Sequence, residues 1–244
     1  MGIPENAAEI YRRVSEALKR SPTPAREVKL IAVSKTFPAE LVAAAMEAGL
    51  YRFGENRVQE ITAKYEALGM RNFVAGHDGK KVPVEWHFIG HLQTNKIKKL
   101  LAVPTRYIHS VDRLEVAIEL DRQLQKRGES REILIEVNTS GEESKSGTEP
   151  EKAAQLVREV ARFGTLKVRG LMTIGKLTED SRITRECFSN LRNLSERIKD
   201  DRIDGVEMGE LSMGMSGDFE IAVEEGATMI RVGTAIFGER PSRA

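Results

Sequence analysis

The chain contains a single cysteine, Cys187, and only 5% of its 244 residues are aromatic. One cysteine excludes an internal disulfide, and this usage fits a reducing compartment. No apolar run approaches the length that crosses a bilayer, and the N-terminus has no signal-peptide pattern. Lys and Arg total 38 against 37 Asp and Glu, a net charge of +1, and there is no basic stripe with interleaved aromatics. We therefore expect a cytoplasmic protein that binds neither membranes nor nucleic acid.

Histidines are also scarce, with four in the chain. His87 and His91 are four residues apart, but Gly90 and the end of a predicted strand lie between them. This differs from the helical His-Glu-x-x-His zinc motif, so no metal site is predicted. We expect His87 to be a hydrogen-bonded residue at the mouth of the predicted fold.

What the sequence does contain is a regular alternation of apolar runs with segments of helical spacing. Eight runs are predicted as strands: 29–34, 50–54, 85–89, 106–110, 132–138, 166–173, 206–212 and 228–233. Near-continuous apolar strands favour a parallel sheet buried on both faces. Eight strand–helix units in this length predict a closed α/β structure, a TIM-type (β/α)₈ barrel, with residues 1–244 as one domain.

The connections carry further expectations. Few residues follow the last strand, and the amphipathic segment 5–20 is predicted to take the place of the usual final helix. Asp112 is placed to cap the helix after the fourth strand. The polar loop 71–84 is predicted to be a surface excursion.

Barrels of this kind carry their chemistry at the carboxyl ends of the strands. Ser212, Gly233 and Thr234 follow strands seven and eight, where small residues and free amides commonly bind phosphate. Lys35 ends strand one, which neighbours strand eight in a closed barrel. A lysine amine beside a phosphate site suits Schiff-base chemistry and so indicates pyridoxal phosphate. Arg231 shares the parity of Gly233 and is expected to face the cofactor's ring nitrogen.

Several segments then resemble, in order, the pyridoxal phosphate homeostasis protein family over residues 28–240. They are residues 30–36, which contain Lys35, 53–56, which end at Asn56, 86–96, 109–113, 138–140 with 143–147, 169–172, 211–216 and 230–238. The resemblance implies a fold-type III barrel like the barrel domain of alanine racemase.

The same resemblance implies roles for individual residues. Lys35 would hold the cofactor as a Schiff base, and Arg231 would face the ring nitrogen. Phosphate contacts would come from Ser212, Gly233 and Thr234, with Asn56 nearby. Together with His87, and with Met213 either lining the ring site or packing in the core, these residues form the predicted cofactor site. The family's members are mostly monomers in vitamin B6 and amino-acid homeostasis, with PLP-dependent apoenzymes as candidate protein partners.

Turnover is left open by the residues. Racemisation needs a base on each face of the substrate carbon, and the similar racemases take their second base, a tyrosine, from an extra domain. We expect this chain to lack that domain and favour a cofactor carrier with little or no turnover. A slow PLP-dependent amino-acid racemase and a cofactor-free Schiff-base aldolase are the alternatives.

Overall fold

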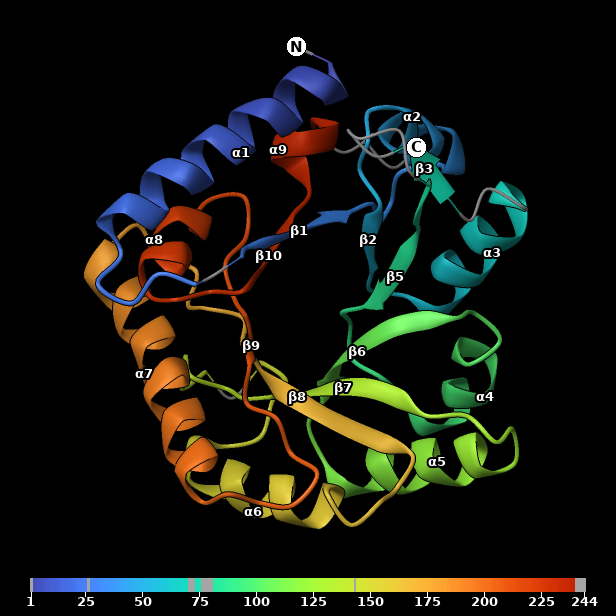
Figure 1. Ribbon diagram of the computed structural model, residues 1–244, viewed down its shortest axis with the longest axis vertical. Helices are drawn as coiled ribbons and strands as arrows, with labels where there is room; N and C mark the ends of the chain where they lie inside the picture. The colour runs from blue at the N-terminus through green and yellow to red at the C-terminus, as the bar shows by residue number, and fades with distance from the viewer. Residues whose placement is uncertain (1, 26, 70–72, 76–80, 143, 240–244) are drawn as a thin grey trace.

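In the computed structural model, which describes residues 2–25, 27–69, 73–75, 81–142 and 144–239, eight parallel strands form a closed barrel ringed by helices (Figure 1). Around the barrel the order is β1, β10, β9, β8, β7, β6, β5 and β2. The strands are β1 (Lys29–Val33), β2 (Arg52–Glu55), β5 (Glu85–Phe88), β6 (Thr105–Val111), β7 (Arg131–Glu136), β8 (Leu166–Met172), β9 (Glu210–Ser212) and β10 (Met229–Val232). The predicted (β/α)₈ barrel is confirmed.

Helices follow the strands on the outside of the barrel. They are α1 (Ile3–Arg20), α2 (Ala39–Glu47), α3 (Val58–Leu68), α4 (Ile97–Leu100) after the 3₁₀ turn η1 (Thr94–Lys96), α5 (Leu114–Gln125), α6 (Pro150–Val160), α7 (Ser181–Asp200), α8 (Phe219–Glu224) and α9 (Thr234–Phe237). In the part of the chain that the structure describes, no helix has both the length and the apolar character needed to cross a bilayer.

Alternation along the strands divides the core into two layers. In β1, Leu30 and Ala32 belong to the large cluster between the sheet and the helices, whereas Ile31 belongs to a small separate cluster. That small cluster, which contains side chains from five strands, fills the barrel interior: Ile31, Tyr107, Leu134, Met172 and Met229. Because side chains alternate along a strand, Arg231 lies on the same side of β10 as Met229 and is directed inward. Its register partner in β1 is Ile31.

The N-terminal helix takes the place of a full final helix, as predicted from segment 5–20. α1 lies along α8 and α9, which are both short (Figure 1). Asn6 Nδ2 donates to the Ile236 carbonyl over 2.9 Å, and Arg13 forms an ion pair with Glu220 over 2.7 Å. These contacts tie the first helix to the chain segment that carries the end of β10.

The structure differs from two local predictions. The prediction that Asp112 caps α5 is wrong, because Arg113 holds the N-cap position without a side-chain cap and Asp112 Oδ1 accepts from Arg113 Nη1 over 2.6 Å. Strand seven is shorter than 206–212, because β9 pairs regularly only from Glu210 onward.

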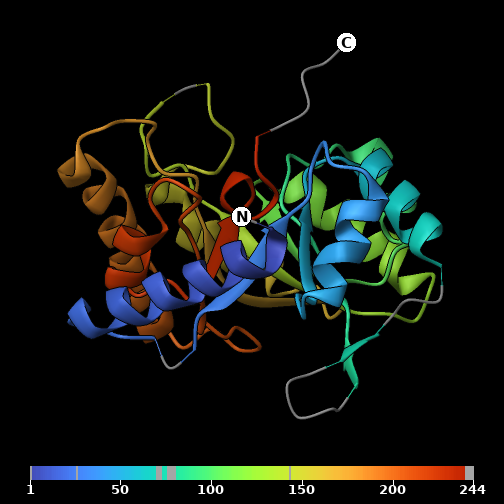
Figure 2. The same ribbon diagram turned by 90° about the horizontal axis from the view of Figure 1, so that it is seen from above.

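In the loop 71–84, the short antiparallel strands β3 (Phe73–Ala75) and β4 (Lys81–Pro83) project from the barrel end opposite to α9 (Figure 2). Residues 71, 72 and 76–80 of that loop lie outside the described residues.

Candidate functional site

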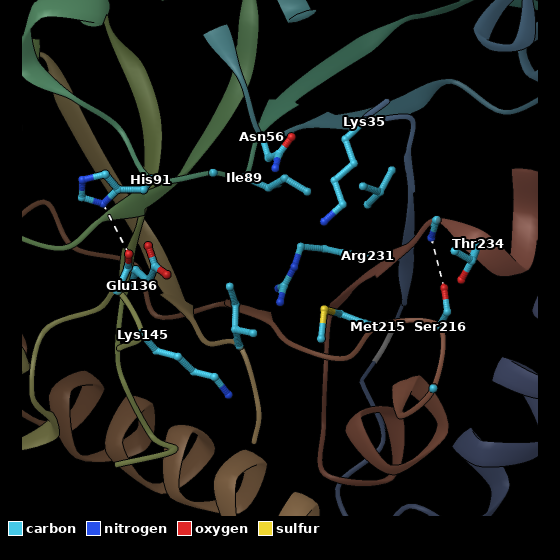
Figure 3. A pocket seen from close by; sticks show the side chains of 16 residues that line it. Lys35, Asn56, Ile89, His91, Glu136, Lys145, Met215, Ser216, Arg231 and Thr234 are labelled. Atoms are coloured by element: carbon cyan, nitrogen blue, oxygen red, sulfur yellow. Dashed lines mark hydrogen bonds between the residues drawn. The ribbon is translucent and has the colours of Figure 1, made fainter. Parts of the chain in front are cut away.

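A cavity of about 560 Å³ opens at the carboxyl ends of the barrel strands. Five of the residues predicted for the site line it: Lys35, Asn56, Arg231, Gly233 and Thr234. Figure 3 shows the Lys35 side chain directed toward Arg231 at its centre, with Ser216 and Thr234 on one side and Glu136 and Lys145 on the other. Because β1 and β10 are adjacent in the barrel, residues nearly 200 positions apart in the chain meet here.

Lys35 enters the cavity from a tight turn at the end of β1. Phe37 N donates to the Ser34 carbonyl over 3.0 Å, and Thr36 has a φ of 71°. Positive φ is uncommon for any residue with a Cβ, and for a β-branched one it is a marked outlier. The turn therefore places the lysine through a backbone conformation that the sequence does not favour locally.

Arg231 is buried at the floor of the cavity, with 4% of its surface exposed. Its Nη1 donates to Ser212 Oγ over 2.6 Å and its Nη2 to the Thr173 carbonyl over 2.8 Å. Among the described residues, no carboxylate forms an ion pair with it. Burial lowers the pKa of Arg231 to about 10, against the opposing effect of Glu136 and Asp218. A guanidinium with only neutral partners favours a ligand that brings negative charge or a strong acceptor.

The opposite wall is built from small groups that donate hydrogen bonds. The amides of Gly233 and Ala235 point at Ser216 Oγ over 3.2 and 3.5 Å, and α9 begins at Thr234. A Cβ on Gly233 would lie 3.2 Å from the Val33 carbonyl oxygen, which is tighter than ordinary van der Waals contact. Amides and hydroxyls that converge without a cation are typical of phosphate sites in proteins.

Three predicted site residues do not line the cavity: His87, Ser212 and Met213. Met213 is fully buried in the main hydrophobic cluster. Ser212 accepts from Arg231 from below the cavity, and His87 is deeper still. Their direct contact with a cofactor therefore stays a prediction, and the contacts in the structure are with other side chains.

Those contacts form a buried chain of hydrogen bonds that ends at Arg231. His87 Nδ1 lies 2.9 Å from His109 Nε2, and His109 Nδ1 lies 2.9 Å from Ser212 Oγ. Burial lowers the pKa of both histidines and so favours the neutral form of both rings. Because an arginine can only donate, Ser212 Oγ accepts from Arg231 and its own proton is available to His109 Nδ1. The assigned direction then has His109 Nε2–H donating to His87 Nδ1, with the proton of the His87 ring on Nε2.

Sequence reasoning missed Glu136, a buried carboxyl at the end of β7 that lines the cavity. Burial raises its pKa to about 7, and the nearby Asp112 carboxylate adds to the effect, while Arg231 and Arg113 oppose it. The usable signal was an acidic residue at the carboxyl end of an otherwise apolar strand, because that end of a barrel carries the chemistry. Among the described residues, no group of His, Cys, Asp and Glu is arranged to hold a metal ion.

The sequence and the fold of this chain were compared with those of known proteins. Residues 6–241 match the family described as alanine racemase, N-terminal domain. A pyridoxal phosphate homeostasis protein of Aquifex aeolicus (strain VF5) is 42% identical over 236 residues, 97% of each chain. The structure of PipY from Synechococcus elongatus PCC7942 with PLP bound is 33% identical, covers 97% of this chain and 100% of that chain, and has a TM-score of 0.81. An alanine racemase of Clostridium difficile 630 shares the fold at 14% identity and a TM-score of 0.71, with 95% of this chain matching 56% of that one.

Proposed function

The chain belongs to the pyridoxal phosphate homeostasis proteins within the alanine racemase N-terminal-domain family, and on this basis we propose that it binds pyridoxal 5'-phosphate in intracellular vitamin B6 and amino-acid homeostasis. The observation that carries the proposal is the pairing of Lys35 and Arg231 in one cavity beside a wall of amides and hydroxyls. The relative PipY, whose structure is described with PLP bound, supports it.

The residues present fit this cofactor. Asn56 Oδ1 is buried without a hydrogen-bond partner among the described residues, so its amide has bonding capacity to spare toward a ligand. Within the described part of the chain, the buried Arg231 guanidinium donates to the neutral Ser212 hydroxyl and Thr173 carbonyl. The cavity volume lies within the range of small-molecule sites. A ligand with a phosphate at one end and a polar aromatic ring would use all three features.

Each residue then has a role. Pyridoxal phosphate, when bound, supplies an aldehyde that condenses with a lysine amine and a ring that withdraws electrons. We assign the covalent attachment to Lys35. Thr234, Ser216 and the Gly233 amide, which donates to Ser216 Oγ in the structure, would bind the phosphate, and Arg231 would face the ring nitrogen. Ser212 and the two buried histidines hold Arg231 in place from beneath.

We propose that the protein acts as a carrier with little or no turnover, as a single-domain monomer. Two-sided proton transfer at a substrate carbon needs a second base, and among the described residues that line the cavity none is a tyrosine. A slow amino-acid racemase is the second candidate. It is favoured by one observation, the buried Glu136 carboxyl, whose pKa near 7 suits proton transfer at neutral pH.

The test compares wild type, Lys35→Ala and Lys145→Ala, because Lys145 lines the same cavity and serves as a matched control. Wild type and Lys145→Ala should show the Schiff-base absorption band with pyridoxal phosphate, and Lys35→Ala should not. Loaded protein is then incubated with amino acids in D₂O, and deuterium at Cα is followed by mass spectrometry. Sustained exchange with loss of optical purity at Cα, measured by chiral chromatography and abolished in Lys35→Ala, would replace the carrier with the racemase, whereas exchange with retained configuration needs only one base.

A further inference from the structure

The backbone on both sides of Lys35 is bonded to charged side chains of α3. Thr36 N donates to Glu60 Oε2 over 2.8 Å, and Lys64 Nζ donates to the Ser34 carbonyl over 2.6 Å. The Ser34 carbonyl belongs to the peptide unit before Lys35, and the Thr36 amide belongs to the peptide unit after it. Both peptide planes that meet at the Lys35 Cα are therefore fixed from the same helix.

A buried ion pair anchors this arrangement. Lys64 is 6% exposed and Glu55 is fully buried, and Lys64 Nζ donates to Glu55 Oε1 over 2.5 Å. The Ser34 hydroxyl donates to the same Glu55 oxygen over 2.7 Å. A buried lysine is costly unless it is paired and hydrogen-bonded, and here its partners are Glu55 and the carbonyl that precedes Lys35.

The conformation being held is one that the chain would not adopt unaided. Thr36 has a φ of 71°, a backbone conformation that is energetically unfavourable for a β-branched residue. Strained backbone of this kind is concentrated at functional sites. Such backbone persists only where its surroundings determine it. The surroundings here are the two hydrogen bonds from α3, one on each side of the lysine.

We propose that Glu60 and Lys64 are positioning residues for Lys35, which hold both of its flanking peptide units so that its side chain enters the cavity. The chemical consequence rests on the proposed function, whereas the geometric claim does not. Neither residue contacts the ligand side of the cavity: Glu60 and Lys64 line a separate groove on the outer face of the turn, together with Phe37 and Ala63.

Glu60 carries the test, because its side chain is 23% exposed and its loss leaves no buried charge unpaired. Glu60→Ala removes the acceptor of the Thr36 amide, and Glu60→Gln keeps an oxygen at the same position. Glu66→Ala, at an exposed glutamate of the same helix, is the matched control. Lys64→Met is the second probe, and it is interpreted only with thermal unfolding beside it because it strands Glu55.

The first readout is hydrogen exchange at the Thr36 amide in cofactor-free protein. We expect exchange to be faster in Glu60→Ala and to stay at the wild-type rate in Glu60→Gln and Glu66→Ala. The second readout is the rate of appearance of the Schiff-base band after addition of pyridoxal phosphate, with its pH dependence. Glu60→Ala should slow the rate about tenfold, which corresponds to about 1.4 kcal/mol, and Glu60→Gln should restore it.

The outcomes separate the two claims. Absence of the band in wild type would defeat the proposed function, while the exchange measurement would still decide the positioning claim. Unchanged Thr36 exchange in Glu60→Ala would overturn that claim. So would faster exchange with a band that forms at the rate and pH dependence of Glu66→Ala, because the turn would then be loosened without consequence for Lys35.

Discussion

The buried Glu136 carboxyl makes the stability of the cofactor-free protein depend on pH in a way that one substitution isolates. Its pKa rises from 4.5 to about 7 on folding, first through burial and then through Asp112. Between these two values the unfolded chain loses the proton while the folded chain keeps it. The contribution of Glu136 to the free energy of unfolding is therefore fully present below pH 4.5 and is lost as the pH rises to about 7.

The magnitude follows from the same two values. Each pH unit between them costs about 1.4 kcal/mol, so the loss above pH 7 is about 3 kcal/mol. Glu136→Gln keeps the size of the side chain and removes the titration. We therefore expect the variant to exceed wild type in free energy of unfolding by about 1 kcal/mol at pH 5 and about 3 kcal/mol at pH 8.

Urea unfolding of both proteins from pH 5 to pH 8, without cofactor, measures the difference directly. Glu151→Gln, at an exposed glutamate of α6, is the control and should track wild type across the range. A difference between Glu136→Gln and wild type that is the same at every pH would refute the reasoning, because it would mean that Glu136 is ionised throughout.

Two further substitutions test the packing of the barrel and the floor of the cavity. Gly170→Ala should destabilise the fold by at least about 3 kcal/mol, because its Cβ would lie 1.8 Å from the Glu210 carbonyl oxygen. Gly164→Ala, with no atom within 4 Å of its Cβ, should change the unfolding midpoint little, and equal effects of the two would contradict the account. Arg231→Lys should cost about 1–3 kcal/mol, because one amine cannot replace two guanidinium donors, and it should also weaken cofactor binding in a fluorescence titration. If Arg231→Lys binds the cofactor with wild-type affinity, the proposed contact between Arg231 and the cofactor is wrong.

The part of the site that sequence could predict is the part that follows from strand ends. Lys35, Arg231 and Gly233 were placed by the alternation of apolar runs and by barrel closure, which brings the first and last strands together. The position of α1 followed similarly, because within the described residues the helix after the last strand, α9, is short. These inferences need the order of elements and the parity along a strand, both of which are local properties.

What sequence missed depends on side chains that meet across the barrel. The chain from His87 through His109 to Ser212 joins β5, β6 and β9, and strand register alone does not give these contacts in advance. Glu136 was missed because acidic residues are rarely buried, although it lies within the predicted strand 132–138. Asp112 was assigned to a cap by its position before a helix, but the Arg113 side chain beside it provides the stronger partner.

The central claim is that Lys35 carries pyridoxal phosphate covalently, and reduction tests it most directly. Protein loaded with the cofactor is treated with borohydride, digested, and mapped by mass spectrometry. The account predicts the reduced pyridoxyl phosphate adduct on the peptide that contains Lys35, and none on the peptide that contains Lys145. An adduct on another lysine, or no adduct on protein that binds the cofactor, would contradict it.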